Sequence, residues 1–532
     1  MFVISNELPQ PHPQSRPPSP LDMPNLPHLP PRKGFTVFRT RHWFMLGAAL
    51  LALLGSLVTA QPGAAAEGRP YTNPVKTQKG ADPWLEYYNG NYYLVTTSFT
   101  NELTMRKSPT LAGLATAPSV QVWSDTTAGR NWNIWAPEIH FLDGKWYLYY
   151  SAGQRGEACC DSQRTHVLES AGSDPMGPYT YKNTLTGSNL SPGGWLIDAS
   201  VLKHDNRLYL MGSGFINGST QSLVIAPMSN PYTLSSSTFR IISSPTLSWE
   251  TQGGSVNEGP EPLYRSGRTF VSFSASSCQT PEYKLGQLEL TGSDPLDPAS
   301  WTKKQTPVFQ RDDAAGVYGP GHNGFFTSPD GTENWIVYHG NDSANGGCGN
   351  GRTTRAQKFT WNADGTPNFG TPLALGTTRP GPAGETAATP TAYTLVNRNS
   401  GKCLDVAGGN TANGTDIFQW TCTGGANQKW RIEDLGDDTS RLVNVATGKV
   451  MDTAECSTAD GANIQQWAWL NNACQKFRLV HTATGDHVRI VNANSGKVAD
   501  VANCGTANGS DVRQWTWLNN NCQQWRIQPT TA

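Results

Sequence analysis

The chain of 532 residues has little charge and no excess of either sign. Its 40 Lys and Arg residues balance 41 Asp and Glu residues, and only 15% of the sequence is charged. Nucleic acids and anionic membranes are bound by basic surfaces, so neither is expected as a partner. Gly, Asn, Ser, Thr, Trp and Tyr are abundant instead. This composition is typical of turn-rich β proteins, and surface aromatic rings can stack on sugars.

Long apolar runs are also missing, with one exception near the N-terminus. The run "WFMLGAALLALLGSLVTA" follows Arg39 and Arg41 and ends at Gln61-Pro62. It is at the short limit for a membrane-spanning helix, and the small residues of the following "GAAAEG" are typical of a signal-peptidase site. We therefore expect residues 1–66 to be an N-terminal extension with a secretory signal peptide, and the mature protein to be extracellular.

Amphipathic helices are absent after residue 70, where a unit of a short turn and an aromatic-rich strand recurs. It reads "NGNYYLVTTS" at 89, "DGKWYLYYSA" at 143, "HDNRLYLMGSG" at 204, "SGRTFVSFSAS" at 266 and "TENWIVYHG" at 332. Such turns beside aromatic strands indicate β-hairpins. Each repeat has room for a four-stranded sheet, so the sequence predicts an all-β chain that opens with a five-bladed β-propeller over residues 67–372.

A second repeat, of 47 to 48 residues, follows a segment rich in Pro, Gly, Thr and Ala at 373–390, which predicts a linker. Its units begin with "GKCLDV" at 401, "GKVMDT" at 448 and "GKVADV" at 496. Units of this size cannot each bury a core, so the three must share one about a pseudo-threefold axis. Each unit holds two cysteines, which predicts one disulfide within each repeat: Cys403 with Cys422, Cys456 with Cys474, and Cys504 with Cys522.

Each unit also ends in Gln-x-Trp or Gln-x-Phe, at 428, 475 and 523. With these endings, residues 391–532 resemble the ricin B-like β-trefoil, carbohydrate-binding module family 13. The resemblance implies that an aspartate and an aromatic residue hold one sugar per repeat: Asp405 with Trp420, Asp452 with Trp467, and Asp500 with Trp515. A carboxylate can accept sugar hydroxyls while an indole covers the C–H face of the ring.

The alternative for these tryptophans is packing, which we favour for Trp430 and Trp525 of the Gln-x-Trp endings. The second and third repeats carry "QWAWLNN" and "QWTWLNN" where the first has "QWTC", so their pockets are expected to differ.

Three acids of the propeller region stand beside repeat strands among uncharged residues. Asp82 lies in "GADPWLEYY", Asp198 in "GGWLIDASVL" and Glu258 in "GGSVNEGPE". Asp-Pro alone would indicate a turn, but equivalent positions of successive blades converge on the propeller channel. There, one carboxylic acid and one carboxylate can hydrolyse a glycoside, and a third acid raises the pKa of its neighbour.

The propeller region resembles glycoside hydrolase family 43 over about residues 70 to 370. The resemblance rests on "ADPW" at 81, "WAPEIH" at 135, "IDASVL" at 197, "NEGPE" at 257, "GPGHNGFF" at 319 and "GRTTRAQKF" at 351. It implies that Asp82 is the general base, Asp198 the residue that tunes the pKa of its neighbour, and Glu258 the general acid of an inverting enzyme. Inversion implies carboxyl groups roughly 6.5 to 9.5 Å apart. Glu261 is the competing acid.

Further pocket residues come from the same resemblance. It implies substrate contacts for Glu138 and Arg355, and Trp84, Phe99 and Trp135 are expected to be pocket walls. The alternatives are a buried carboxylate bonded to backbone or arginine for Glu138, a structural salt bridge for Arg355, and core packing for the three aromatic residues. No cofactor is expected for the chemistry. His322 matches a histidine that approaches a water-bound ion in relatives, so a structural Ca²⁺ or Na⁺ is the metal hypothesis; such hard cations prefer several oxygen ligands.

Four cysteines of the propeller region allow three pairings. Cys159 and Cys160 are adjacent, with Cα atoms about 3.8 Å apart, so a bridge between them would be strained. Cys278 and Cys348 can pair with each other or with these two.

The substrate prediction also rests on resemblance. The segments "TSFTNELTMRKSPTLAGL" and "CCDSQRTHVLESAGSDPMGPYTY" are similar to the arabinan-active branch, in particular to exo-acting α-1,5-L-arabinofuranosidases. The alternatives are an endo-arabinanase or a β-xylosidase with the same three acids, and a non-catalytic two-domain lectin. The expected partner is plant cell-wall polysaccharide, with arabinan, xylan or galactan held by the trefoil, and the expected state is a monomer.

Overall fold

The computed structural model describes residues 68–157, 160–216, 220–482 and 486–532. The predicted N-terminal extension and signal peptide, 1–66, lies outside the described residues. Within these ranges the only helices are 3-10 turns, and none of them could reach across a membrane. The all-β prediction is confirmed. The turns span Ala112–Ala115, Ser248–Glu250, Pro298–Ser300, Ala407–Gly409, Ala426–Gln428, Ala454–Cys456, Ala473–Gln475, Ala502–Cys504 and Asn521–Gln523.

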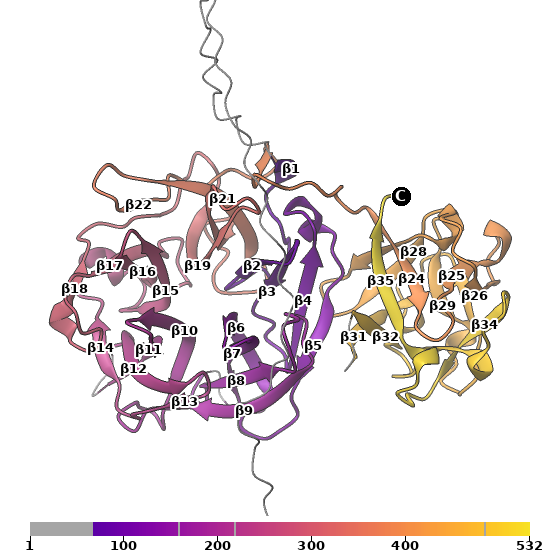
Figure 1. Cartoon of the computed structure of the whole chain (residues 1–532), viewed down its shortest axis with the longest axis horizontal. Coiled ribbons are helices and arrows are strands. Elements are labelled where there is room, and N and C mark those ends of the chain that lie inside the picture. Colours follow the sequence, from indigo (N-terminus) through magenta and orange to yellow (C-terminus); the bar gives the residue numbers. More distant parts are fainter. Residues whose placement is uncertain (1–67, 158–159, 217–219, 483–485) are drawn as a thin grey trace, which may run out of the picture. The chain divides into compact units, whose positions relative to one another are not determined.

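Four separate antiparallel sheets form propeller blades in the described part of the chain, each from strands consecutive in sequence (Figure 1). The first holds β6 (Trp132–Leu142), β7 (Lys145–Gly153), β8 (Arg164–Ser170) and β9 (Tyr179–Leu185). The second holds β10 (Leu196–His204), β11 (Arg207–Gly214), β12 (Ser222–Asn230), β13 (Thr233–Leu234) and β14 (Arg240–Ser243). The third holds β15 (Asn257–Arg265), β16 (Arg268–Ala275), β17 (Lys284–Leu290) and β18 (Trp301–Lys303). The fourth holds β19 (Tyr318–Thr327), β20 (Asn334–Asn341), β21 (Thr353–Trp361) and β22 (Pro367–Asn368).

The strands β2 (Trp84–Tyr88), β3 (Asn91–Val95), β4 (Glu102–Ser108) and β5 (Val120–Ser124) pair in the same sequential way. They do not form a separate sheet, because β5 also pairs in parallel with β31 of the C-terminal region. The first strands of these groups contact one another in the order β2, β6, β10, β15, β19 and back to β2, and they lie nearest the centre in Figure 1.

The turns predicted from sequence explain why these strands form hairpins. Asn89-Gly90 joins β2 to β3 and Asp143-Gly144 joins β6 to β7, and all four residues have positive φ. Two-residue turns with positive φ match the twist of the strands that they connect. Apolar side chains then fill the spaces between blades: Met211 of β11, for example, packs in one cluster with Val271 and Phe273 of β16.

The predicted linker is attached to the propeller. Strand β23 (Thr378–Gly381) pairs with β1 (Gly68–Thr72). Glu385 is buried, and its carboxylate accepts hydrogen bonds from the backbone N–H groups of Arg69 and Leu111. The segment therefore packs along the first residues of the domain.

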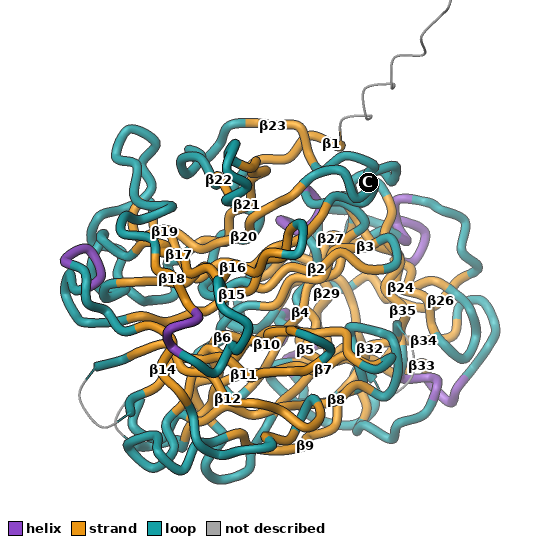
Figure 2. Tube along the Cα trace, turned by 60° about the vertical axis from the view of Figure 1, so that its left-hand side comes forward, coloured by secondary structure: helices purple, strands orange, loops and turns teal. Residues whose placement is uncertain are grey.

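The C-terminal region is a trefoil of short strands, shown with the other strands in orange in Figure 2. Its strands are β24 (Ala392–Asn397), β25 (Cys403–Val406), β26 (Thr415–Trp420), β27 (Trp430–Asp434), β28 (Ser440–Asn444), β29 (Val450–Thr453), β30 (Ile464–Trp467), β31 (Phe477–His481), β32 (His487–Asn492), β33 (Val498–Val501), β34 (Ser510–Trp515) and β35 (Trp525–Thr530). The three predicted disulfides, Cys403–Cys422, Cys456–Cys474 and Cys504–Cys522, are present. Trp430 and Trp525 are fully buried in the shared core, as the packing alternative predicts.

Candidate active site

Local backbone irregularities, in or just before inner strands, position the three predicted acids. Asp82 and Asp198 have φ values of 50° and 56°, in the left-handed region that non-glycine residues rarely adopt. The register of β10 shifts between Ile197 and Ser200, and that of β15 shifts between Glu258 and Glu261. Bulges of this kind re-aim side chains next to active sites.

Asp82, Asp198 and Glu258 line one pocket of about 420 Å³. The structure thus brings together three acids that lie far apart in the sequence. The other lining residues are Phe99, Asn133, Trp135, Cys160, Trp195, Ile197, Gln221, Val256, Ser277, Cys278, Gln279, His322, Cys348 and Arg352. Aromatic and aliphatic walls with a few polar groups are typical of a small-ligand site.

Asp82 is held in its ionised form. Burial raises the pKa of this carboxyl, but the positive charge of Arg352 and the contacts with His322 and His339 outweigh burial and hold the pKa well below its usual value. The Arg352 Nη1 lies 3.1 Å from Asp82 Oδ1, and the Thr97 hydroxyl donates to Oδ2 at 2.5 Å. These contacts fix both the charge and the orientation of Asp82.

The pKa values of the two histidines beside Asp82 are shifted in opposite directions. The backbone N–H of Asp82 donates to His339 Nδ1 at 3.1 Å, and burial, together with the charge of Arg352, lowers the pKa of His339 to about 4. His339 is therefore neutral. Burial also lowers the pKa of His322, but the charges of Asp82, Asp198 and Glu258 outweigh burial and raise it above its ordinary value.

Asp198 and Glu258 have the opposite tendency to Asp82. Burial, and the charge of Glu258, raise the pKa of Asp198. Burial also raises the pKa of Glu258, although hydrogen bonds from Tyr283 and Gln221 oppose the shift. The Tyr283 hydroxyl donates to Glu258 Oε1 at 2.7 Å, and the N–H of Gly259 donates to Asp198 Oδ2 at 3.1 Å. The pocket is therefore lined by one ionised carboxylate and two carboxyls that favour a proton.

The structure separates the other predicted pocket residues into two groups. Phe99, Trp135 and His322 line the pocket, whereas Trp84, Glu138 and Arg355 do not. Trp84 belongs to the core and packs on His140, with ring centroids 4.7 Å apart.

Two of the residues outside the pocket take up structural positions. Glu138 is buried and lies 2.9 Å from His140 Nε2. Arg355 is 0% exposed, and its Nε donates to the hydroxyl of Thr353.

Glu261, the competing acid, is buried away from the pocket. Burial, followed by the charge of Glu138, raises its pKa well above the usual value. Glu258 is thus the acid of this segment that faces the pocket.

Sequence reasoning missed the residues that set the charge state of the acids: Arg352, His339, Thr97, Tyr283 and Gln221. Arg352 stands in the motif "GRTTRAQKF", three residues before Arg355. It precedes β21 and faces the pocket, whereas Arg355 lies within the strand. Arg352 stands just before β21, as Asp82 stands just before β2. This shared position is the signal in the sequence that could have identified Arg352.

Three cysteines of the propeller, Cys160, Cys278 and Cys348, line the pocket. Cys278 is bonded to Cys348, which excludes the pairings of either with Cys159 or Cys160. Cys160 lines the pocket and is disulfide-bonded; Cys159 lies outside the described residues. The carbonyl of Cys348 accepts a hydrogen bond from Arg352 Nη2 at 2.7 Å, so the Cys278–Cys348 bridge holds the loop from which Arg352 reaches Asp82.

The surroundings of His322 do not fit a directly bound cation. Its Nδ1 lies 3.3 Å from Asp82 Oδ1, and that oxygen also contacts Arg352. Among the described residues, no group of three or more His, Cys, Asp or Glu side chains is arranged to hold a metal. Ca²⁺ takes six to eight oxygen ligands, so an ion here would depend on water, and the chemistry below uses only protein groups.

The trefoil aspartates lie on equivalent strands of the three repeats. Asp405, Asp452 and Asp500 are buried on β25, β29 and β33, and each strand pairs with the strand that carries the tryptophan of its repeat. Trp420 is 39% exposed, and Trp467 and Trp515 are half-buried. Sugar contact by these residues stays a prediction.

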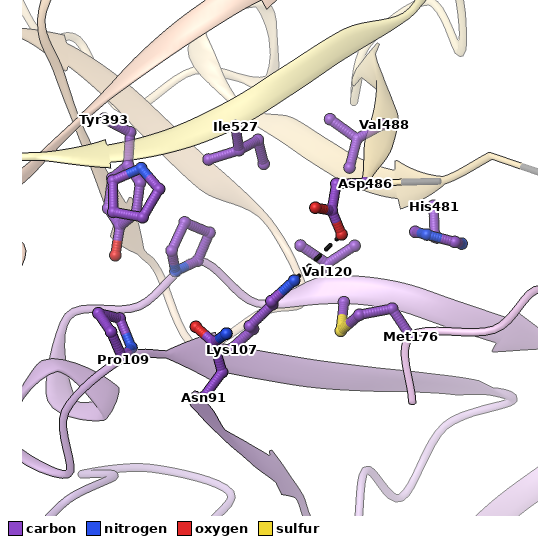
Figure 3. A pocket seen from close by; sticks show the side chains of 12 residues that line it. Asn91, Lys107, Pro109, Val120, Met176, Tyr393, His481, Asp486, Val488 and Ile527 are labelled. Atoms are coloured by element: carbon purple, nitrogen blue, oxygen red, sulfur yellow. Dashed lines mark hydrogen bonds and ion pairs between the residues drawn. The ribbon is translucent and has the colours of Figure 1, made fainter. Parts of the chain in front are cut away.

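Another pocket, of about 280 Å³, lies among Asn91, Lys107, Pro109, Val120, Met176, Tyr393, His481, Asp486, Val488 and Ile527, with Pro118 and Pro529 (Figure 3). Its one acid, Asp486, pairs with Lys107 at 3.1 Å. Because its lining offers no pair of carboxyl groups, it cannot perform paired-carboxylate chemistry.

Comparison with known proteins gives two family matches. Residues 71–367 match the family "Glycosyl hydrolases family 43", and residues 384–467 and 473–532 match "Ricin-type beta-trefoil lectin domain-like".

Individual relatives agree with the first match. An extracellular exo-α-(1→5)-L-arabinofuranosidase of Streptomyces avermitilis is 40% identical over 63% of this chain and 71% of its own length. An α-L-arabinofuranosidase 43 of Humicola insolens is 35% identical over 58% of this chain and 65% of its own. The crystal structure of an α-L-arabinofuranosidase from Lactobacillus brevis is 33% identical, covers 58% of this chain and 98% of its own, and gives a TM-score of 0.54.

Proposed function

Because the chain belongs to glycosyl hydrolase family 43, and is therefore a glycoside hydrolase, we propose that it is a secreted, inverting exo-α-1,5-L-arabinofuranosidase. The observation that carries the proposal is the pocket in which ionised Asp82 lies with the proton-retaining Asp198 and Glu258. The relatives from Streptomyces avermitilis and Humicola insolens are both named as arabinofuranosidases. The name of the first describes an extracellular enzyme, which agrees with the export signal expected at 1–66.

The proposed mechanism assigns one task to each acid. Asp82 accepts a proton from a water molecule, whose oxygen attacks the anomeric carbon. Glu258 donates its proton to the glycosidic oxygen as the carbon–oxygen bond breaks, so that arabinose and a shortened chain leave. Asp198 acts through Glu258, because the two buried carboxyls interact and ionisation of one favours the protonated form of the other.

The same proposal includes the domain boundaries. Residues 67–372 form the catalytic propeller, 373–390 the linker and 391–532 the trefoil, and we count β2–β5 as a fifth blade. The ring of contacts among the first strands β2, β6, β10, β15 and β19 supports this count.

Product analysis tests the proposal. The mature protein is incubated with linear α-1,5-arabinan, with nitrophenyl arabinofuranoside and nitrophenyl xyloside in parallel. We expect arabinose alone from the earliest time points. Early arabino-oligosaccharides would indicate an endo-arabinanase, xylose release with intact arabinan would indicate a β-xylosidase, and the absence of any product would indicate a lectin.

Replacing Asp198 with asparagine should change the pH dependence of turnover. The acid form of Glu258 is active, so activity is present below its raised pKa and is lost as the pH rises through that value. Asp198 and Glu258 are neighbouring buried carboxyls that raise each other's pKa, so ionisation of one delays loss of the proton of the other. Asparagine at 198 removes this second ionisable group, so the alkaline limb should move by roughly one unit toward lower pH. A pH profile of kcat/KM measures this shift; an unchanged alkaline limb with a uniformly lower rate would contradict the role of Asp198.

We propose further that the trefoil binds plant cell-wall polysaccharide and keeps the propeller close to its substrate. Removing residues 380–532 should then leave turnover of nitrophenyl arabinofuranoside within about twofold and reduce retention on insoluble polysaccharide at least tenfold. Kinetics and a pull-down assay measure the two effects. Because the truncation removes β23 and Glu385, which pack on the propeller, its control ends after residue 390. Loss of small-substrate turnover in this control would contradict the separation of the two roles.

A further inference from the structure

The three trefoil repeats differ at one position that faces the sugar-binding aspartate. In the β-ladders, Asp405 lies opposite Phe418, Asp452 opposite Gln465, and Asp500 opposite Arg513. Phe418, Gln465 and Arg513 each stand two positions before the tryptophan of their repeat, and residues two apart on a strand share a face. The position therefore lies beside both halves of the expected sugar site.

In the first repeat the neighbours of the aspartate are neutral. Asn427 Nδ2 and Gln428 Nε2 donate to Asp405 at 2.9 and 2.7 Å. The ring of Phe418 is tilted against that of Trp420, with centroids 5.7 Å apart. The carboxylate is thus oriented by amides, which leave its charge in place.

In the second repeat an amide takes the equivalent place. Gln465 Nε2 donates to Asp452 Oδ1 at 3.0 Å. Among the described residues, no cation lies over the ring of Trp467. The guanidinium of Arg441 lies over the neighbouring ring of Trp469 instead. An amide side chain can also hydrogen-bond a sugar hydroxyl, so this pocket retains both of its binding elements.

In the third repeat Arg513 occupies both binding elements at once. Its Nε donates to Asp500 Oδ2 at 3.1 Å, and its guanidinium carbon lies 4.0 Å from the ring centroid of Trp515. The side chain of Asp500 is 7% exposed and that of Arg513 is 21% exposed, so the pair is largely shielded from water. A sugar would have to displace a guanidinium from the carboxylate and from the indole face together.

We propose that Arg513 closes the third trefoil pocket to neutral sugars, so that the trefoil binds polysaccharide through the Asp405 and Asp452 pockets. This inference rests on the proposed function of the trefoil. An acidic sugar is not the favoured ligand for Arg513, because its carboxylate would meet the negative charge of Asp500 on the same guanidinium.

Single-pocket variants of the full chain test the proposal. All carry Glu258→Gln, so that the probe is not digested. Adding Asp405→Asn and Asp452→Asn leaves only the third pocket, and adding Asp405→Asn and Asp500→Asn leaves only the second. Each protein is run on native gels that contain soluble arabinan, arabinoxylan, galactan or polygalacturonate, and its migration is compared with that of the variant in which all three aspartates are replaced. Circular dichroism and thermal unfolding check that each variant is folded.

The residues at the differing position, Gln465 and Arg513, are then exchanged between the two pockets. We expect the second-pocket protein to be retarded by at least one neutral polysaccharide and the third-pocket protein to migrate like the triple variant. Adding Arg513→Gln to the third-pocket protein should produce retardation, and adding Gln465→Arg to the second-pocket protein should abolish it. The reciprocal design makes the result independent of sugar bound in the propeller.

Several results would overturn the proposal. Retardation of the third-pocket protein with Arg513 in place would show that the pocket is open. A folded Arg513→Gln variant that gains nothing while the second pocket binds would show that another feature closes it. Retardation by polygalacturonate alone, lost with Arg513→Gln, would show that Arg513 recognises a carboxylate. If the chain with all three aspartates is not retarded by any of the four probes, the sugar-binding role of the trefoil itself is contradicted.

Discussion

Replacing Glu258 with alanine is expected to lower kcat on arabinan by about 10²- to 10⁴-fold, the range typical of a lost general acid. The loss should be much smaller on nitrophenyl arabinofuranoside, because a nitrophenolate leaves without needing a proton. Steady-state kinetics on the two substrates give the ratio. The structure motivates this difference because Glu258 lies in the pocket with a raised pKa and accepts a hydrogen bond from Tyr283.

The matched control is Glu261→Gln, which changes the other acid of the same strand. Glu261 is buried outside the pocket, so this variant should affect stability more than the ratio of activities on the two substrates. If Glu258→Ala lost activity equally on both substrates while Glu261→Gln showed the leaving-group dependence, the acid would be Glu261.

Replacing Asp82 with asparagine is expected to lower kcat by about 10²- to 10⁴-fold on both substrates alike. An amide cannot accept the proton of the attacking water, and a better leaving group does not replace that step. Asparagine tolerates positive φ at least as well as aspartate, so the backbone at this position is preserved. Kinetics on arabinan and on nitrophenyl arabinofuranoside measure the two losses.

Asp143→Asn is a closely matched control for Asp82→Asn. Asp143 has the same φ of 50°, but it lies exposed in the turn between β6 and β7. It should keep full activity. If Asp82→Asn lost activity only on arabinan, its effect would be on leaving-group departure and the assignment of the base would be wrong.

The strands and the positions of the acids could be predicted from sequence because their causes are local. Turns such as Asn89-Gly90 and Asp143-Gly144 set the hairpins, and the setting of Asp82, Asp198 and Glu258 among uncharged residues beside repeat strands indicated one shared pocket. The spacing of the trefoil cysteines predicted their disulfides for the same reason.

The residues that control the acids could not be predicted, because they reach the pocket from distant parts of the chain. Arg352 contacts Asp82 across 270 positions of sequence, and spacing alone does not distinguish it from Arg355. The core position of Trp84 depends on its packing against His140, which the sequence does not show. The pairing of β5 with β31 joins a propeller strand to a trefoil strand. Each repeat pattern describes only its own region, so neither pattern predicts this pairing.

The trefoil shows how repeats that look alike in sequence differ in chemistry. Asn427 orients Asp405 in the first repeat, whereas the equivalent residues of the other repeats are Cys474 and Cys522 of the disulfides. Arg513 is the one basic residue of β34, which also holds Asp511. Its contacts with Asp500 and Trp515 are visible only once the register is known.

The most direct test of the central claim is the anomeric configuration of the first product. Proton NMR spectra recorded in the first minutes of arabinan hydrolysis, before mutarotation, identify the arabinofuranose anomer that is released. Attack of a water activated by Asp82, on the side opposite the proton from Glu258, predicts β-L-arabinofuranose from the α-linked chain. Initial release of the α anomer would mean a covalent intermediate and would contradict the roles assigned to these carboxyl groups.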